Sequence, residues 1–150
     1  MIIIGEKING SIPPVAKAIA EKDAEFIKHR AQIQADANAT YIDCCASVEE
    51  SIEVETLHWM IDLIQEVTDV PICIDSPSPH SCVAAIPFCK KPGLINSVSM
   101  EGDKIDVIFP VIADTKWECV ALLCDDKGIP NSVERRMEVF HNVMEKAKEY

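Results

Sequence analysis

Basic residues are few in this sequence of 150 residues: 14 lysines and arginines stand against 25 aspartates and glutamates, a formal net charge of -11. A chain this acidic is not expected to bind a nucleic-acid backbone or an anionic membrane surface. No apolar run approaches the roughly 20 residues that a membrane-spanning helix needs. The first residues, Met1 to Glu6, lack the basic stretch and long apolar core of a signal peptide, so a strand is predicted there instead.

Several motifs of known chemistry are also absent. The 7 cysteines form no Cys-x-x-Cys pair, and their odd number indicates reduced thiols and a cytoplasmic location. Adjacent Cys44 and Cys45 would point to opposite faces of a strand, so no metal site is predicted there. The segment from Gly5 to Gly10 is not G-x-G-x-x-G, which disfavours a nucleotide-binding doubly wound sheet. The sequence also shows no Ser-His-Asp or Cys-His arrangement of the kind that would indicate a covalent nucleophile.

The sequence does contain five short apolar runs, each closed by a carboxylate or an amide. The clearest is Ile72-Cys73-Ile74, which ends at Asp75 and is typical of a strand buried on both faces. With 48% hydrophobic and 26% charged residues, the chain has the balance of one globular domain over residues 1–150. The polar residues that close the five runs are Glu6 and Asn9, Asp43, Asp75, Asn96 and Ser97, and Asp125 and Asp126.

Helical patterns separate the runs, so strand and helix alternate five times. This alternation, without hairpin signals, predicts a parallel sheet with right-handed crossovers. Ligands bind at the carboxyl ends of parallel strands, so the closing residues are predicted to surround one mouth. The helices are expected from Ile12, from Asp23 to about Ala37, from a Ser47–Glu50 capping box, from Ser78 to about Pro87, after Asp103, and after Asn131 as a cap. The last helix has one apolar stripe, predicted to form its buried face: Val133, Met137, Phe140, Met144 and Ala147.

Five stretches of the chain carry a resemblance to a known family. They are residues 3–10 (IIGEKING), 23–26 (DAEF), 73–76 (CIDS), 94–97 (LINS) and 126–130 (DKGIP). Together they resemble the pterin-binding methyltransferases, above all the methyltetrahydrofolate:corrinoid protein methyltransferases. The folate domain of cobalamin-dependent methionine synthase and dihydropteroate synthase are similar to a lesser degree. The resemblance runs from Met1 to Tyr150.

The resemblance implies a (β/α)8 TIM barrel of the dihydropteroate synthase-like type, with about the first five βα units in residues 1–150. It implies an enzyme that moves a methyl group between N5 of methyltetrahydrofolate and the cobalt of a corrinoid (cobalamin) on a partner protein. No metal bound directly to this chain and a homodimer are also expected. Family roles make Asp75 and Asn96 the catalytic residues that hold the pterin ring. The other residues expected to bind the substrate are Glu6, Asn9, Asp43, Ser76 and Ser97.

Pterin chemistry agrees with these roles. The ring presents N–H and amino donors beside ring acceptors, so a carboxylate and an amide in one plane suit it. The methyl group leaves a tertiary amine, which is a poor leaving group until it is protonated or hydrogen-bonded. Catalysis therefore needs a polar network that strengthens as charge develops on that nitrogen, together with alignment of methyl group and cobalt.

The chain departs from the family pattern in three places. Lys7 stands where the family usually has Arg, and so lacks the bidentate fork. Cys45 takes the place of the amide in the usual Asp-x-Asn at the end of the second strand. The last three βα units of the family, which carry another pterin-binding Asp and the amide nearest the methylated nitrogen, would lie beyond Tyr150. Half of the site is therefore expected here, and the chain alone should bind a pterin weakly and transfer no methyl groups.

Three other interpretations compete with a methyltransferase. A dihydropteroate synthase would use the same scaffold, although that family carries a different asparagine-rich loop after its first strand. A non-catalytic fragment that binds a partner subunit would explain why strands are missing. In the simplest case, the strand-end carboxylates only cap turns.

Overall fold

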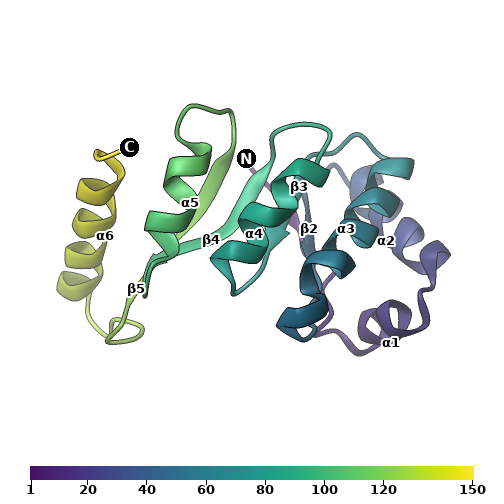
Figure 1. Ribbon diagram of the computed structural model, residues 1–150, viewed down its shortest axis with the longest axis horizontal. Coiled ribbons are helices and arrows are strands. Elements are labelled where there is room, and N and C mark those ends of the chain that lie inside the picture. The colour runs from purple at the N-terminus through teal and green to yellow at the C-terminus, as the bar shows by residue number, and fades with distance from the viewer.

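A computed structural model describes residues 1–150 and shows five strands in one parallel sheet (Figure 1). The strands pair in chain order, so each is hydrogen-bonded to the next. The predicted α/β alternation is confirmed. The strands are β1 (Ile4–Gly5), β2 (Tyr41–Cys45), β3 (Ile72–Asp75), β4 (Leu94–Met100) and β5 (Glu118–Asp125).

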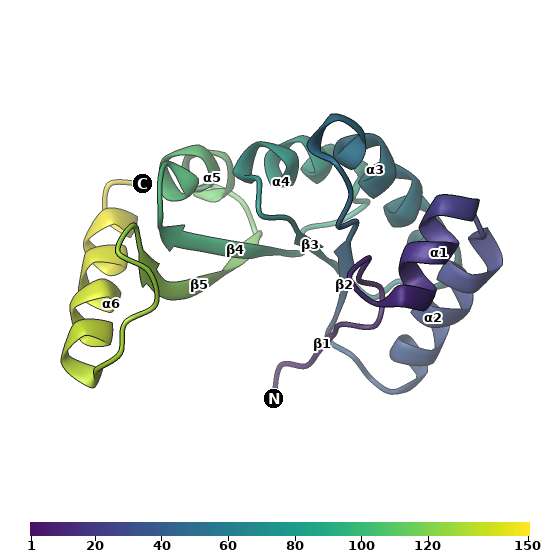
Figure 2. The same ribbon diagram turned by 90° about the horizontal axis from the view of Figure 1, so that it is seen from below.

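The sheet curls into a half-barrel, and the helices lie along its outer, convex side (Figure 2). Successive residues of a strand point to opposite faces. Ile42, Ile74 and Ile95 are fully buried in the core between sheet and helices. The residues that alternate with these isoleucines along each strand therefore point to the concave side. The helices are α1 (Pro13–Glu21), α2 (Ala24–Asp36), α3 (Glu50–Val67), α4 (Pro79–Ala85), the 3-10 helix η1 (Ile86–Phe88), α5 (Lys104–Ile112) and α6 (Val133–Ala147).

Helix starts were predicted with mixed success. Asp23 caps α2 by accepting from the Phe26 N–H at 3.1 Å, as expected. The Ser47–Glu50 capping box is wrong, because α3 begins at Glu50 after Glu49 with no side-chain cap. Ser47 instead has a positive φ of 48°, and its hydroxyl lies near Cys45 and Asn9.

The cap of α6 is Ser132 rather than Asn131. Ser132 has extended backbone, and its hydroxyl accepts from the Arg135 N–H at 3.2 Å, the geometry that a capping side chain needs.

The boundary of β4 differs from the prediction. The apolar run was expected to end at Ile95, but the strand continues through Met100, with register shifts against β5 on either side of Val98. An irregular stretch of this kind bends the strand locally. Asn96 therefore lies inside β4 rather than in a loop after it.

The outer edges of the half-barrel are open. Strands β1 and β5 each have one neighbour. On α6 the buried residues are Val139 and Val143, so the predicted buried face is wrong. No further strand lies beyond β5 to receive the apolar stripe, which leaves Val133, Met137, Phe140 and Met144 exposed. No helix combines the length and the apolar character that crossing a bilayer demands.

Candidate functional site

The strand register places three of the closing residues, together with Cys45, in one row at the carboxyl end of the sheet. Cys45 of β2 pairs with Asp75 of β3, and Asp75 pairs with Asn96 of β4. A bridge between Asn9 and Cys45 extends the row to the loop after β1. Paired residues of neighbouring parallel strands point to the same face. The four side chains therefore lie side by side on the concave face of the half-barrel.

Asp43 lies one layer deeper on the same face. It is two residues before Cys45 along β2 and pairs with Cys73 of β3. Asp43 is 1% exposed, and its Oδ1 accepts a long hydrogen bond of 3.4 Å from Nδ2 of Asn96. This bond connects the two layers.

Burial perturbs both carboxyl groups. It raises the pKa of Asp43 to about 7, and the negative charges of Asp75 and Glu6 act in the same direction. Hydrogen bonds from Cys73 and Asn96 oppose the rise in the pKa of Asp43. Burial also raises the pKa of Asp75, against a hydrogen bond from Cys45. Neighbouring carboxylates disfavour double ionisation, so the pair is able to hold a proton near neutral pH.

The loop after β1 holds Asn9 in a defined orientation. The Asn9 Oδ1 accepts from the Ser11 N–H at 2.9 Å and from the Ser11 hydroxyl at 2.6 Å. With this oxygen occupied, the amide N–H groups are the part of Asn9 left to bind a ligand. The loop passes close to β2 at Gly10, where a Cβ atom would lie 2.0 Å from the carbonyl oxygen of Ala46. Only glycine fits there.

The remaining predicted residues lie near this row, with different surroundings. Glu6 directly follows β1 and is exposed. Ser76 is buried and its hydroxyl donates to Oε1 of Glu53 at 2.8 Å, so that group is already engaged within the chain. Ser97 follows Asn96 and is half-buried. Lys7 is exposed, and its backbone N–H donates to the Gln34 side chain at 2.8 Å.

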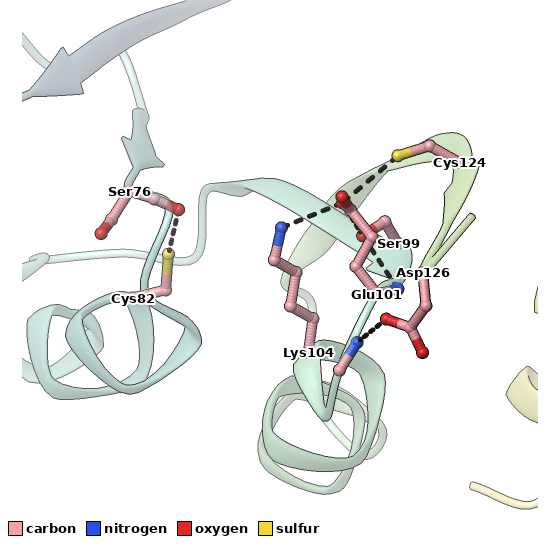
Figure 3. Close-up of polar contacts among 8 residues, drawn as sticks. Ser76, Cys82, Ser99, Glu101, Lys104, Cys124 and Asp126 are labelled. Atoms are coloured by element: carbon pink, nitrogen blue, oxygen red, sulfur yellow. Dashed lines mark hydrogen bonds and ion pairs between the residues drawn. The ribbon is translucent and has the colours of Figure 1, made fainter. Parts of the chain in front are cut away.

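At β5 the closing carboxylates form contacts of another kind. Asp125 forms an ion pair with Arg135 of α6, and Asp126 accepts from the Gly102 N–H at 2.9 Å (Figure 3). The expectation that all five strand ends supply free polar groups to one mouth is therefore wrong for β5. In the row of Asn96, β5 contributes the apolar Val120.

A separate polar cluster joins the ends of β4 and β5. Oε2 of Glu101 accepts from the Ser99 hydroxyl at 2.7 Å, from Nζ of Lys104 at 3.2 Å and from Sγ of Cys124 at 3.3 Å (Figure 3). The hydrogen bond from Ser99, followed by those from Cys124 and Lys104, lowers the pKa of Glu101. The cluster holds the two strand ends together beside the row that contains Asn96.

Sequence reasoning missed three side chains of the site. Cys73 lies beside Asp43, and the alternation along β3 with Asp75 was the signal that could have placed it on the concave face. Cys45 was noted only as a departure from a pattern, whereas the structure places it between Asn9 and Asp75. Glu53 carried no signal, because an acidic residue in a first helical turn is ordinarily exposed.

Two comparisons with known proteins bear on this arrangement. Residues 16–149 match the family described as the tetrahydromethanopterin S-methyltransferase MtrH subunit. A methylcorrinoid:tetrahydrofolate methyltransferase of Eubacterium limosum is 55% identical over 152 residues, which cover 100% of this chain and 56% of that protein. The chain thus spans about half the length of the curated relative it matches.

Proposed function

The chain belongs to the tetrahydromethanopterin S-methyltransferase MtrH subunit family, and on that premise we propose that it is the pterin-binding part of a corrinoid methyltransferase. The proposed reaction moves a methyl group between N5 of methyltetrahydrofolate and the cobalt of a corrinoid carried by a partner protein. The observation that carries the proposal is the register that pairs Asp75 with Asn96 on the concave face.

This pair suits a pterin ring. The carboxylate of Asp75 accepts from a ring N–H and an amino group, while the Asn96 amide both donates and accepts. Asn9 adds N–H donors from the same row, because its oxygen is held by Ser11. Donors and acceptors in a line match the edge of a flat heterocycle better than they match a metal ion or a phosphate.

The carboxyl pair also suits the proton movement of the reaction. When N5 of tetrahydrofolate gains the methyl group, it forms a bond to carbon and must lose its proton. The bond from carbon to cobalt breaks, and its electron pair remains on the metal. A carboxyl group whose pKa is about 7, such as Asp43, can accept a proton near neutral pH and release it again. Asn96 joins Asp43 to the proposed ring site through its hydrogen bond of 3.4 Å.

We propose further that the half-barrel is part of a complete (β/α)8 barrel. The parallel order, the curl of the sheet and the open edges at β1 and β5 support this. The 56% share of the curated relative leaves length in that protein for three more βα units. A homodimer and a cytoplasmic location stay predictions.

Titration of methyltetrahydrofolate into the isotope-labelled chain, followed by NMR, tests the proposal. We expect weak binding that shifts the side-chain amide signals of Asn96 and Asn9. The matched control ligand is p-aminobenzoylglutamate, which has the tail of the folate without the pterin and should leave these signals unchanged. Equal shifts with both ligands would refute pterin recognition, and no shifts with either would favour a non-catalytic fragment that binds a partner subunit.

Dihydropteroate synthase is the other enzyme activity that must be distinguished from a methyltransferase. Both the matching family and the curated relative are described as methyltransferases, so neither supports it. A dihydropterin diphosphate that shifted the same signals at much lower concentration than methyltetrahydrofolate would reverse the choice.

A further inference from the structure

Glu53 is a buried carboxylate for which the proposed reaction has no direct use. It lies in the first turn of α3 and is 3% exposed. Removing a carboxylate from water is costly unless hydrogen bonds compensate for it. The first turn of a helix favours negative charge, and the Ser76 hydroxyl donates to Oε1 at 2.8 Å. The chain therefore keeps a buried carboxyl group at this place with a single side-chain partner.

That partner, Ser76, is held at each of its polar groups. Its N–H donates to the carbonyl oxygen of Asn96 at 3.2 Å, across the gap between β3 and β4. Its hydroxyl oxygen accepts from the Ser78 N–H at 3.0 Å. Its carbonyl oxygen accepts from Sγ of Cys82 at 3.7 Å (Figure 3). Ser76 thus connects β4, α3 and the start of α4 at one point.

Ser76 also follows Asp75 directly in the chain. The peptide that joins them is therefore held to Asn96 on one side and, through the Ser76 hydroxyl, to Glu53 on the other. We propose that Glu53 is a positioning residue that sets the spacing of Asp75 and Asn96 through Ser76. The inference rests on the proposed function, because it assigns those two side chains to the pterin ring.

Loss of the carboxylate would free the Ser76 hydroxyl to rotate. A buried hydroxyl proton without an acceptor is unfavourable, so the turn after β3 would shift toward a new partner. A hollow beside Glu53, lined in part by Ser78 and His80, gives water access to this place. Glu53→Ala is therefore expected to fold, with the shifted turn hydrogen-bonded to a water molecule in this hollow.

The test compares Glu53→Ala with Glu53→Gln in the full chain, using methyltetrahydrofolate as the ligand. Glu53→Ala should weaken binding about tenfold, since one buried hydrogen bond is lost. Glu53→Gln should stay within about twofold of the unaltered chain, because its amide oxygen accepts from the same hydroxyl. Glu55→Ala is the matched control: it removes the same charge from an exposed position two residues along α3.

A double-mutant cycle with Ser76→Ala separates positioning from general stability. In the Ser76→Ala background, Glu53→Ala should change the Kd by less than about twofold, because the two side chains act as one unit. Two results would overturn the proposal. One is a lower Tm for Glu53→Ala with unchanged affinity, and the other is an equal loss of affinity in Glu53→Gln and Glu53→Ala.

A second readout does not depend on any ligand. The Ser76 N–H should exchange slowly with solvent in the unaltered chain and in Glu53→Gln, and at least about tenfold faster in Glu53→Ala. If the chain binds no pterin, the proposed function fails, while this exchange rate still decides whether Glu53 positions the turn. Equal exchange in all three proteins would show that it does not.

Discussion

Replacing Asp43 by asparagine is predicted to stabilise the fold at neutral and alkaline pH while removing a group assigned to the proposed reaction. Burial raises the pKa of Asp43 from an ordinary 3.8 to about 7. In the unfolded chain the same carboxyl group titrates near pH 4. The folded protein therefore holds a proton that the unfolded chain releases between about pH 4 and 7.

The sign of the effect follows from this difference. Below about pH 4 both states are protonated, so Asp43 causes no loss of stability there. As the pH rises to about 7, the free energy of unfolding falls by up to about 1.4 kcal/mol per pH unit. The total loss approaches about 4 kcal/mol by pH 8. Asparagine is neutral throughout, and its amide oxygen can still accept from Asn96. Because an amide oxygen is a weaker acceptor than a carboxylate, the net gain expected at pH 8 is about 2–4 kcal/mol.

Urea unfolding followed by circular dichroism, at pH values from about 4 to 8, measures this difference. The unaltered chain should lose stability as the pH rises through this range, and Asp43→Asn should show a flatter dependence. Asp114→Asn is the control, because Asp114 is exposed and forms no hydrogen bond or ion pair in the structure. Parallel pH curves for the chain and Asp43→Asn would refute the assignment of a buried, protonated carboxyl group at this position.

Three further predictions concern the ligand row and the open edge. Asp75→Ala should weaken methyltetrahydrofolate binding about tenfold or more, with an unchanged circular dichroism spectrum; unaltered affinity would exclude Asp75 from the site. Cys45→Asn should strengthen binding a few-fold, since an amide N–H is a better donor than a thiol; weaker binding would contradict this. The chain should self-associate in sedimentation at micromolar concentration, and a double substitution Phe140→Lys and Met144→Lys should reduce the association. A well-behaved monomer with cooperative melting would argue against an interrupted barrel.

The strands that form the site were predictable because their sequence pattern and their environment agree. Ile72 to Ile74 is short, apolar and covered on its outer face by helices, so the run could only be a buried strand, and Asp75 had to follow at its carboxyl end. Asn96 closes the next apolar run and pairs with Asp75, as expected for closing residues around one mouth, although β4 continues past it. Register in a parallel sheet then aligned the two side chains without any further signal.

Local polar patterns misled the prediction where tertiary contacts decided the outcome. Ser47 and Glu50 have the spacing of a capping box, yet the positive φ of Ser47 turns its hydroxyl toward Cys45 and Asn9. Asp125 has the same strand-end position as Asp75, but Arg135 on α6 neutralises it. A strand-end motif alone does not identify the side chains from other loops or helices that will contact its polar residues.

The composition of the row indicates which part of the proposed pterin site this chain would supply. From β1 to β4 the row runs Asn9, Cys45, Asp75 and Asn96, and at β5 it ends in the apolar Val120. A ring held along one edge by Asp75 and Asn96 would meet an apolar side chain next, because the carboxylates at the end of β5 contact Arg135 and Gly102 instead. We expect further polar contacts to the proposed ring to come from elements that continue the sheet past β5. The open edge of β5 and the exposed stripe of α6 are where such elements would pack.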